Sequence, residues 1–205
     1  MYDSYAHYRG ARDAAWRILL DAGIGHLPVD LTCVIRHLNI LAVTYAESPG
    51  LLSYLASRGR AVSEDGFTVL SESGPVILYG DAVRPEGRRR FTMAHELGHI
   101  ILGHRPDESG VLSRWNRWDA ENSDPREAEA NIFASRLMAP ARVLHALGAY
   151  SVYEIMELTG LSYTAALIRA ERMAELARRG AWDRSPLERR VYERFIPWIN
   201  SVKGQ

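Results

Sequence analysis

Residues 91–104 read FTMAHELGHIILGH and carry the clearest chemical signal in the chain. His95 and His99 stand four residues apart, with Glu96 between them. Positions four apart share one face of an α-helix, so both imidazoles can bind a single metal ion, and zinc suits imidazole nitrogen. Glu96 can then take a proton from a water molecule and deliver it to a leaving amine. The stretch therefore predicts a helix over about 88–102 that carries a zinc site and a catalytic base.

A catalytic zinc ion usually has three protein ligands and one open position, so a third ligand is needed. His104 follows His99 by five residues, which places it about 140° further round the helix and just past Gly103. From there His104 does not share the helix face of the two other histidines. We interpret it as a helix-end residue that orients a ligand, rather than as a ligand itself.

The next predicted helix, over 125–138, offers better candidates in Glu127 and Glu129. These glutamates are two residues apart and point in directions about 200° apart, so only one of them can face the site. Glu127 shares its face with Asn131, four residues later, beside the apolar stripe of the helix. We predict Glu127 as the third ligand and Asn131 as its orienting neighbour, and we keep Glu129 as the alternative ligand.

Elsewhere the sequence predicts helices before and after a small sheet. Residues 40–46, 67–71 and 75–79 are rich in strand-forming side chains, and the last two segments read as a hairpin. A long polar loop is expected over 105–125. Helices grouped on either side of the strands favour an α+β fold rather than an alternating α/β fold. The predicted helices are 11–22, 30–38, 51–57, 88–102, 125–138 and several more within 141–205.

We expect residues 1–150 to form one domain around the zinc site. Residues 151–205 read as a helical segment, broken near Gly160, Gly180 and Pro186, that packs on this domain.

The composition argues against several classes of protein. Lysine plus arginine number 25 and aspartate plus glutamate number 25, whereas a dedicated nucleic-acid binder usually carries a basic excess. The single cysteine, Cys33, cannot form a disulfide within the chain, which fits a reducing compartment. The polar N-terminus has no signal segment, and no apolar run approaches the ~20 residues of a membrane span. We expect a cytoplasmic protein that binds neither membrane nor nucleic acid, and the sequence indicates no oligomeric state.

Two stretches, 91–104 and EAEANIFASRLMAP at 127–140, resemble the ImmA/IrrE family of metallopeptidases. The family pattern is similar to R-x-F-T-x-A-H-E-x-G-H-x-x-L-x-H followed by E-x-E/Q-A-N-x-F-A-x-x-L-L-x-P. One departure is Met138–Ala139–Pro140, where the family more often has Leu-Met-Pro. The residues that fit are Arg89, Phe91, Thr92, Ala94, His95, Glu96, Gly98, His99, Leu102, His104, Glu127, Glu129, Ala130, Asn131, Phe133, Ala134, Leu137 and Pro140.

This resemblance implies a gluzincin-like minimal zinc-peptidase domain. Its site would consist of His95, His99 and a glutamate of the next helix, with Glu96 as the base and zinc as the cofactor, for which manganese can substitute. The resemblance also implies the substrate, since members of this family cleave helix-turn-helix repressor proteins. We therefore expect such a repressor as the partner.

Two other functions are compatible with the sequence. The first is a protein that inactivates a repressor or toxin by contact alone, with a purely structural zinc ion. The second is a DNA-binding regulator that uses 151–173, which superficially read as a helix-turn-helix with Ser162, Tyr163 and Arg169 facing a groove. We favour instead a hairpin packed on the catalytic domain, in which Tyr163 has an alternative role in stabilising an oxyanion.

Overall fold

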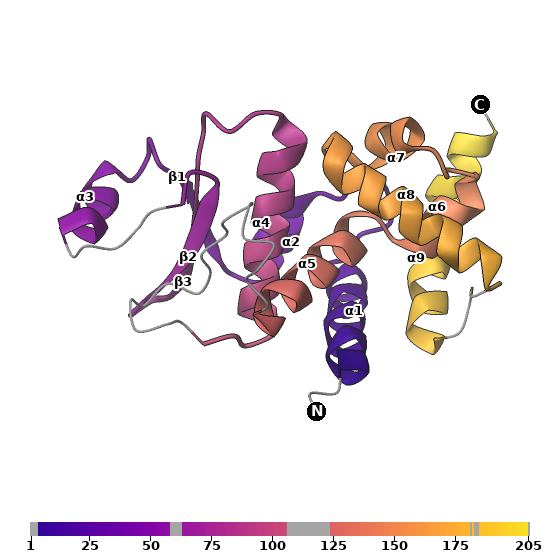
Figure 1. Ribbon diagram of the computed structural model, residues 1–205, viewed down its shortest axis with the longest axis horizontal. Coiled ribbons are helices and arrows are strands. Elements are labelled where there is room, and N and C mark those ends of the chain that lie inside the picture. Colours follow the sequence, from indigo (N-terminus) through magenta and orange to yellow (C-terminus); the bar gives the residue numbers. More distant parts are fainter. Residues whose placement is uncertain (1–3, 58–62, 106–123, 181, 183–184, 205) are drawn as a thin grey trace.

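The computed structural model describes residues 4–57, 63–105, 124–180, 182 and 185–204, and it combines helices with one small sheet (Figure 1). Most of the predicted loop at 105–125 lies outside the described residues. The strands are β1 (Leu41–Thr44), β2 (Gly66–Ser71) and β3 (Gly74–Tyr79). The helices are α1 (Ser4–Asp21), α2 (Leu31–His37), α3 (Pro49–Ser57), α4 (Glu86–Ile101), α5 (Pro125–Met138), α6 (Ala141–Leu147), α7 (Val152–Thr159), α8 (Tyr163–Arg178) and α9 (Pro186–Lys203).

The sheet has the order β1-β3-β2, with β1 parallel and β2 antiparallel to β3. Strand β2 is therefore an edge strand, and Thr68 in its middle pairs with Ile77 of β3. The side chain of Thr68 is fully buried because α4 packs against β2. This arrangement brings a polar side chain of the edge strand to the helix that carries the two histidines.

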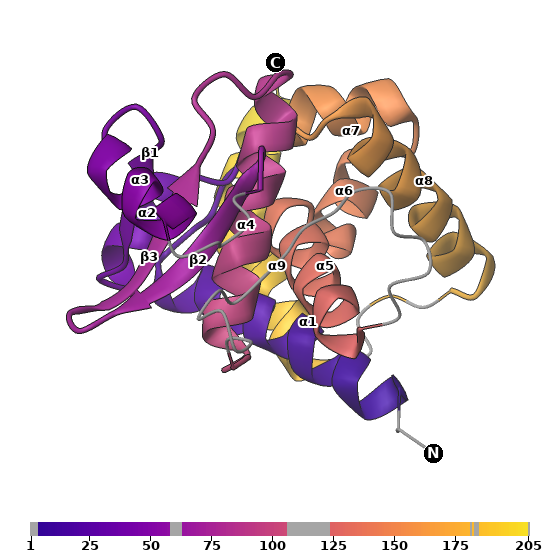
Figure 2. The same ribbon diagram turned by 60° about the vertical axis from the view of Figure 1, so that its left-hand side comes forward.

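Helix α4 occupies the centre of the molecule. Figures 1 and 2 both show it between the sheet on one side and helices α1 and α5 on the other. Its side chains Ala94 and Leu97 are fully buried in one apolar cluster with Leu19 of α1 and with Phe133 and Leu137 of α5. Burial of this apolar surface fixes the helix that presents the histidines.

The turn between α7 and α8 packs directly on the first turn of α4. A Cβ atom added to Gly87 would lie 2.5 Å from the amide nitrogen of Ser162 and 2.6 Å from the carbonyl oxygen of Gly160. These distances are far inside van der Waals contact, so only glycine permits this approach. The C-terminal hairpin is thereby attached to the N-terminal end of α4.

The α+β class and the order of elements agree with the sequence prediction. Helix α5 has the predicted bounds. Helix α1 begins at Ser4 rather than at residue 11. The prediction was too short because the first turns of this helix are polar and lack apolar periodicity. No helix among the described residues is long and apolar enough to cross a membrane. The division of the chain at residue 150 stays a prediction.

The alternative in which 151–173 read DNA does not agree with the structure at two of its three residues. Arg169, which that hypothesis places in a DNA groove, is 1% exposed, and its Nη2 donates to the carbonyl oxygen of Ala139. The hydroxyl of Ser162 accepts from the amide of Ala165 and so caps α8. Neither side chain is free to contact bases, because each has a structural role inside the hairpin.

Gly87→Ala is expected to lower the free energy of unfolding by about 1–3 kcal/mol, because the new methyl group overlaps backbone atoms that cannot move independently. Urea unfolding followed by circular dichroism measures this change. Gly10→Ala in α1 is the matched control, because nothing lies within 4 Å of a Cβ atom at that position. The control should be neutral or stabilising by up to ~1 kcal/mol. Equal stability of the two variants would contradict the packing of the hairpin on α4.

Candidate metal centre

Two imidazoles of α4 face the same point. Both His95 and His99 are fully buried, and their Nε2 atoms lie 2.9 Å apart. They occupy successive turns of one helix, as their spacing of four residues predicts. The site is thus built on a regular helix held in the core, which limits the motion of both rings.

Glu127, from the first turn of α5, completes this cluster. Its Oε2 lies 3.1 Å from His95 Nε2, and its Oε1 lies 3.4 Å from His99 Nε2. Burial on its own would raise the pKa of Glu127, but hydrogen bonding and charge attraction to His95 and His99, when these rings carry a proton toward it, outweigh burial and hold that pKa well below its usual range. The side chain is therefore an anion that can balance the charge of a cation.

Asn131 determines which nitrogen of His95 points at the cluster. Its Oδ1 lies 3.1 Å from His95 Nδ1. An amide oxygen only accepts hydrogen bonds, so Nδ1 carries the proton and donates. The lone pair of His95 Nε2 consequently faces His99 and Glu127, where a metal ion would need it.

His104 gives His99 the same orientation by a less obvious route. Gly103 has a φ of +68°, and this left-handed turn returns the chain so that the backbone N–H of His104 donates to the carbonyl oxygen of His99. His104 Nδ1 then lies 2.9 Å from His99 Nδ1, and His104 Nε2 lies 2.9 Å from Glu129 Oε2. Because the carboxylate accepts from His104 Nε2, the other nitrogen of His104 accepts from His99 Nδ1–H.

This chain of contacts requires a neutral His104. Burial lowers the pKa of His104, and its hydrogen bond to Glu129, which acts in the opposite direction, does not restore the usual value. The neutral ring leaves His99 Nε2 with a free lone pair toward Glu127. Glu129 is directed at His104 rather than at the paired imidazoles, so the geometry favours Glu127 over Glu129 as a metal ligand.

The close approach of α4 and α5 makes this convergence possible. A Cβ atom added to Gly98 would lie 3.1 Å from the Cα of Ala130 and 3.2 Å from a ring carbon of Phe133. The two helices meet at their smallest residues, Gly98 next to His99 in α4 and Ala130 one turn after Glu127 in α5. A glycine inside a helix costs about 1 kcal/mol relative to alanine, and here it allows a second backbone to pass.

The donor set fits a zinc ion. Three ligand atoms that each lie 2.0–2.1 Å from a tetrahedral zinc ion are about 3.4 Å from one another. The separations between His95 Nε2, His99 Nε2 and the oxygens of Glu127 are 2.9, 3.1 and 3.4 Å. Two nitrogen lone pairs and a carboxylate at such distances repel each other unless a cation lies between them. Within the described residues these three side chains form a group able to hold a metal ion.

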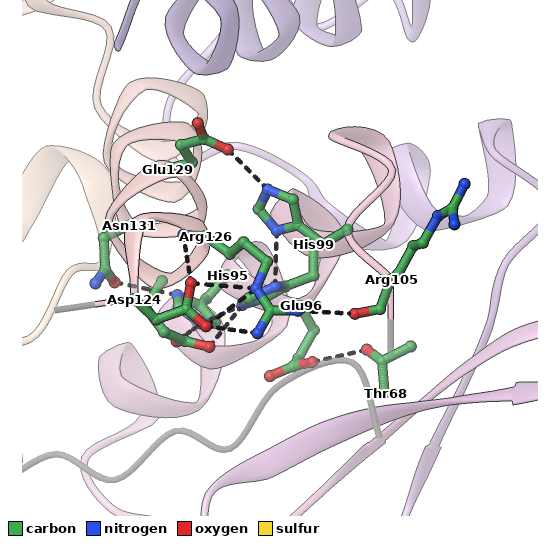
Figure 3. A network of polar contacts seen from close by, with 11 residues as sticks. Thr68, His95, Glu96, His99, Arg105, Asp124, Arg126, Glu129 and Asn131 are labelled. Carbon is green, nitrogen blue, oxygen red and sulfur yellow. Dashed lines mark hydrogen bonds and ion pairs between the residues drawn. The ribbon is translucent and has the colours of Figure 1, made fainter. Parts of the chain in front are cut away.

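Glu96 lies beside this group on the sheet side of α4. Its carboxylate is fully buried, and the hydroxyl of Thr68 on β2 donates to Oε2 at 2.7 Å (Figure 3). The hydrogen bond fixes one oxygen of the carboxylate and stabilises its charge. Sequence reasoning missed Thr68, because nothing in the strand pattern of 67–71 distinguishes it from an ordinary strand residue.

A polar link between the two helices was also missed. Asp124 caps α5 by accepting from the backbone N–H of Arg126 at 2.9 Å, and Arg126 Nη1 donates to the carbonyl oxygen of Arg105 at 3.0 Å (Figure 3). The link ties the start of α5 to the chain just past α4 and so supports the position of Glu127. The dipeptide Asp124–Pro125 was a readable signal, because aspartate at the cap followed by proline marks a helix start.

A cavity of about 320 Å³ opens near the start of β2. Its lining includes Tyr45, Asp65 and Arg88. Burial and, to a lesser extent, the carboxylates of Glu96 and Asp65 raise the pKa of Tyr45, so this phenol is neutral and near the catalytic helix. The residues that line this cavity do not include His95, Glu96, His99 or Glu127, so the cavity is separate from the metal centre.

Glu127→Gln is expected to weaken zinc binding by more than ~100-fold, beyond the 10–100-fold typical of residues that only orient ligands. The amide keeps the shape of the side chain but removes the negative charge. Competition with a chromophoric chelator measures the affinity, and Glu129→Gln serves as the matched control. A larger loss in Glu129→Gln than in Glu127→Gln would reverse the assignment of the third ligand.

Comparison with known proteins finds a matching family. Residues 54–171 match the family model of the IrrE N-terminal-like domain, Peptidase_M78. A search of the curated proteins gives no match. The matched stretch contains α4 and α5, which supply both histidines and Glu127, and it confirms the resemblance drawn from the sequence motifs. Because the match covers more than half of the 205 residues, the chain belongs to the Peptidase_M78 family of metallopeptidases.

Proposed function

We propose that the protein is a zinc-dependent endopeptidase of the cytoplasm that cleaves a helix-turn-helix repressor. The observation that carries the catalytic part is the buried carboxylate of Glu96 beside the group formed by His95, His99 and Glu127. In a purely structural metal site such a carboxylate has no role and costs free energy to bury. Its presence favours a reaction site.

Each side chain has a definite task in this proposal. His95, His99 and Glu127 hold the zinc ion, which when bound polarises a carbonyl group and makes water more acidic. Glu96 accepts the proton of the attacking water and passes it to the leaving amine. Thr68 donates to Oε2 of Glu96 at 2.7 Å and so holds the carboxylate in a fixed orientation.

The substrate part of the proposal rests on the family resemblance. Related peptidases act on helix-turn-helix repressors, and removal of such a repressor by cleavage relieves repression irreversibly. The competing function is a protein that inactivates the same partner by contact alone. The two functions differ in whether Glu96 is required, because binding uses the surface and hydrolysis uses the base.

Glu96→Gln is expected to lower the rate of cleavage by about 10²–10⁴-fold, because an amide cannot accept the proton. Zinc content and binding of the partner should stay at the wild-type level, since the amide is isosteric with the carboxylate. Mass spectrometry of a purified helix-turn-helix repressor encoded beside the gene, incubated with each variant, measures cleavage. Full relief of repression by Glu96→Gln in cells would favour the contact-only function.

Thr68→Val is expected to lower kcat roughly 10- to 100-fold with little change in KM, because a hydrogen bond to a buried charge is lost. Thr68→Ser keeps the hydroxyl and should retain most of the activity, which separates positioning of Glu96 from packing. Zinc content is measured in parallel. A wild-type kcat in the valine variant would exclude a role for Thr68.

A further inference from the structure

Half of the large apolar side chains left exposed by the described part of the chain lie on one hairpin, formed by α7 and α8. A solvated helix surface usually carries scattered apolar residues rather than a group. We refer to the following four as the apolar hairpin face: Tyr153 (74% exposed), Tyr163 (51%), Leu167 (38%) and Ile168 (61%).

These side chains lie on neighbouring parts of the exposed side of the hairpin. The ring centroids of Tyr153 and Tyr163 lie 6.3 Å apart across the two helices. Leu167 follows Tyr163 by one helical turn on the same face, and Ile168 lies about 100° further round α8 than Leu167 but is also exposed. The surface thus combines two aromatic rings and two branched aliphatic groups, the composition typical of the centre of a protein interface.

The hairpin is firmly built, so this exposure does not result from poor packing. Ser151 and Glu154 form a capping box at the start of α7, and Gly160 ends α7 with a φ of +66°. The opposite side of the hairpin buries Ile155 and Ala166 completely in the main apolar cluster. A rigid surface loses little conformational entropy when a partner binds.

Carboxylates surround the apolar hairpin face. Glu157 lies one turn after Tyr153, and Glu171 lies one turn after Leu167, and both are exposed. The arginines of this stretch do not offset them, because Arg169 is buried and Arg172 is bonded to Glu175 and to the hydroxyl of Tyr8. The rim of the surface is therefore acidic.

The acidic rim decides which partner fits. Glu157 and Glu171 would repel the phosphates of DNA and of an anionic membrane. Contact with a second copy about a two-fold axis would bring the acidic rim against itself, which also costs free energy. A protein with an apolar centre and a rim of lysine or arginine satisfies both features of the surface.

We infer that the apolar hairpin face docks a basic protein partner. This inference deepens the proposed function and rests on it in one respect, because a DNA-binding repressor must carry basic side chains to bind phosphates. The contact of Gly87 with the turn between the two helices attaches this docking surface to α4. A partner bound there is held at a fixed position relative to the catalytic helix, which raises its effective concentration at the site.

The test uses the zinc-loaded full chain with Glu96→Gln, so that binding is measured without cleavage. The probe is a fluorescein-labelled helical peptide of about 20 residues, a length that spans ~30 Å, with leucines on one face and arginines beside them. The control peptide has glutamate in place of every arginine. Fluorescence anisotropy is expected to show binding of the basic peptide only.

Ile168→Ser is expected to weaken binding about 10-fold or more, as for a residue at the centre of an interface. The double variant with Glu157→Lys and Glu171→Lys should weaken binding by about as much, because it reverses the charge of the rim. Leu41→Ser is the matched control, because Leu41 is 57% exposed on β1, outside the surface, and should bind as the parent does. Equal binding of the acidic peptide, or no effect of Ile168→Ser, would overturn the inference. So would Ile168-dependent binding of a 20-base-pair DNA duplex, of phosphatidylglycerol vesicles or of a second copy of the chain.

The docking inference and the proposed peptidase function can fail independently of each other. If the wild-type chain cleaves no repressor while the basic peptide still binds the apolar hairpin face, the peptidase proposal fails and the docking surface stands. If cleavage of a repressor proceeds with unchanged KM in Ile168→Ser, the docking inference fails and the peptidase stands. If both hold, Ile168→Ser raises KM for the repressor and leaves its kcat unchanged.

Discussion

The close approach of α4 and α5 at Gly98 and Ala130 is the constraint on which the metal centre depends. Glu127 reaches the two imidazoles only because no side chain separates the two backbones at this point. A larger residue at 98 would move α5 outward by a few tenths of an ångström or more. Metal ligands tolerate errors of about 0.2 Å, so the packing of small residues and the chemistry of the centre cannot be separated.

The second requirement is that both imidazoles present the same nitrogen. Asn131 achieves this for His95 directly, whereas His99 depends on His104, which in turn depends on Glu129. In each of these contacts a neutral imidazole donates a hydrogen bond from one ring nitrogen, which leaves a lone pair on the other ring nitrogen. The ring orientation is therefore set by residues that do not themselves face the metal position, which explains why the glutamates of α5 divide into two roles.

Local periodicity explains what could be predicted from the sequence. Residues four apart share one face of every α-helix, so the pairing of His95 and His99 could be predicted without knowledge of the fold. The bounds of α5 follow from Asp124, Pro125 and the apolar stripe. Thr68 could not be found in this way, because its contact with Glu96 depends on how an edge strand packs against a helix 28 residues later. The sequence predicted that His104 orients a ligand, but its contact with His99 depends on the turn at Gly103, whose φ of +68° is a property of the folded chain.

Helix α4 connects every functional feature of the molecule. Its first turn holds the hairpin through Gly87, its middle carries the two imidazoles and Glu96, and its end directs His104 back toward the centre. A rigid helix transmits position well along its length, because backbone hydrogen bonds and burial on several sides limit its bending. The hairpin and the metal centre are thus both positioned by helix α4. A partner held at the first turn of this helix therefore lies at a defined distance from Glu96 in its third turn.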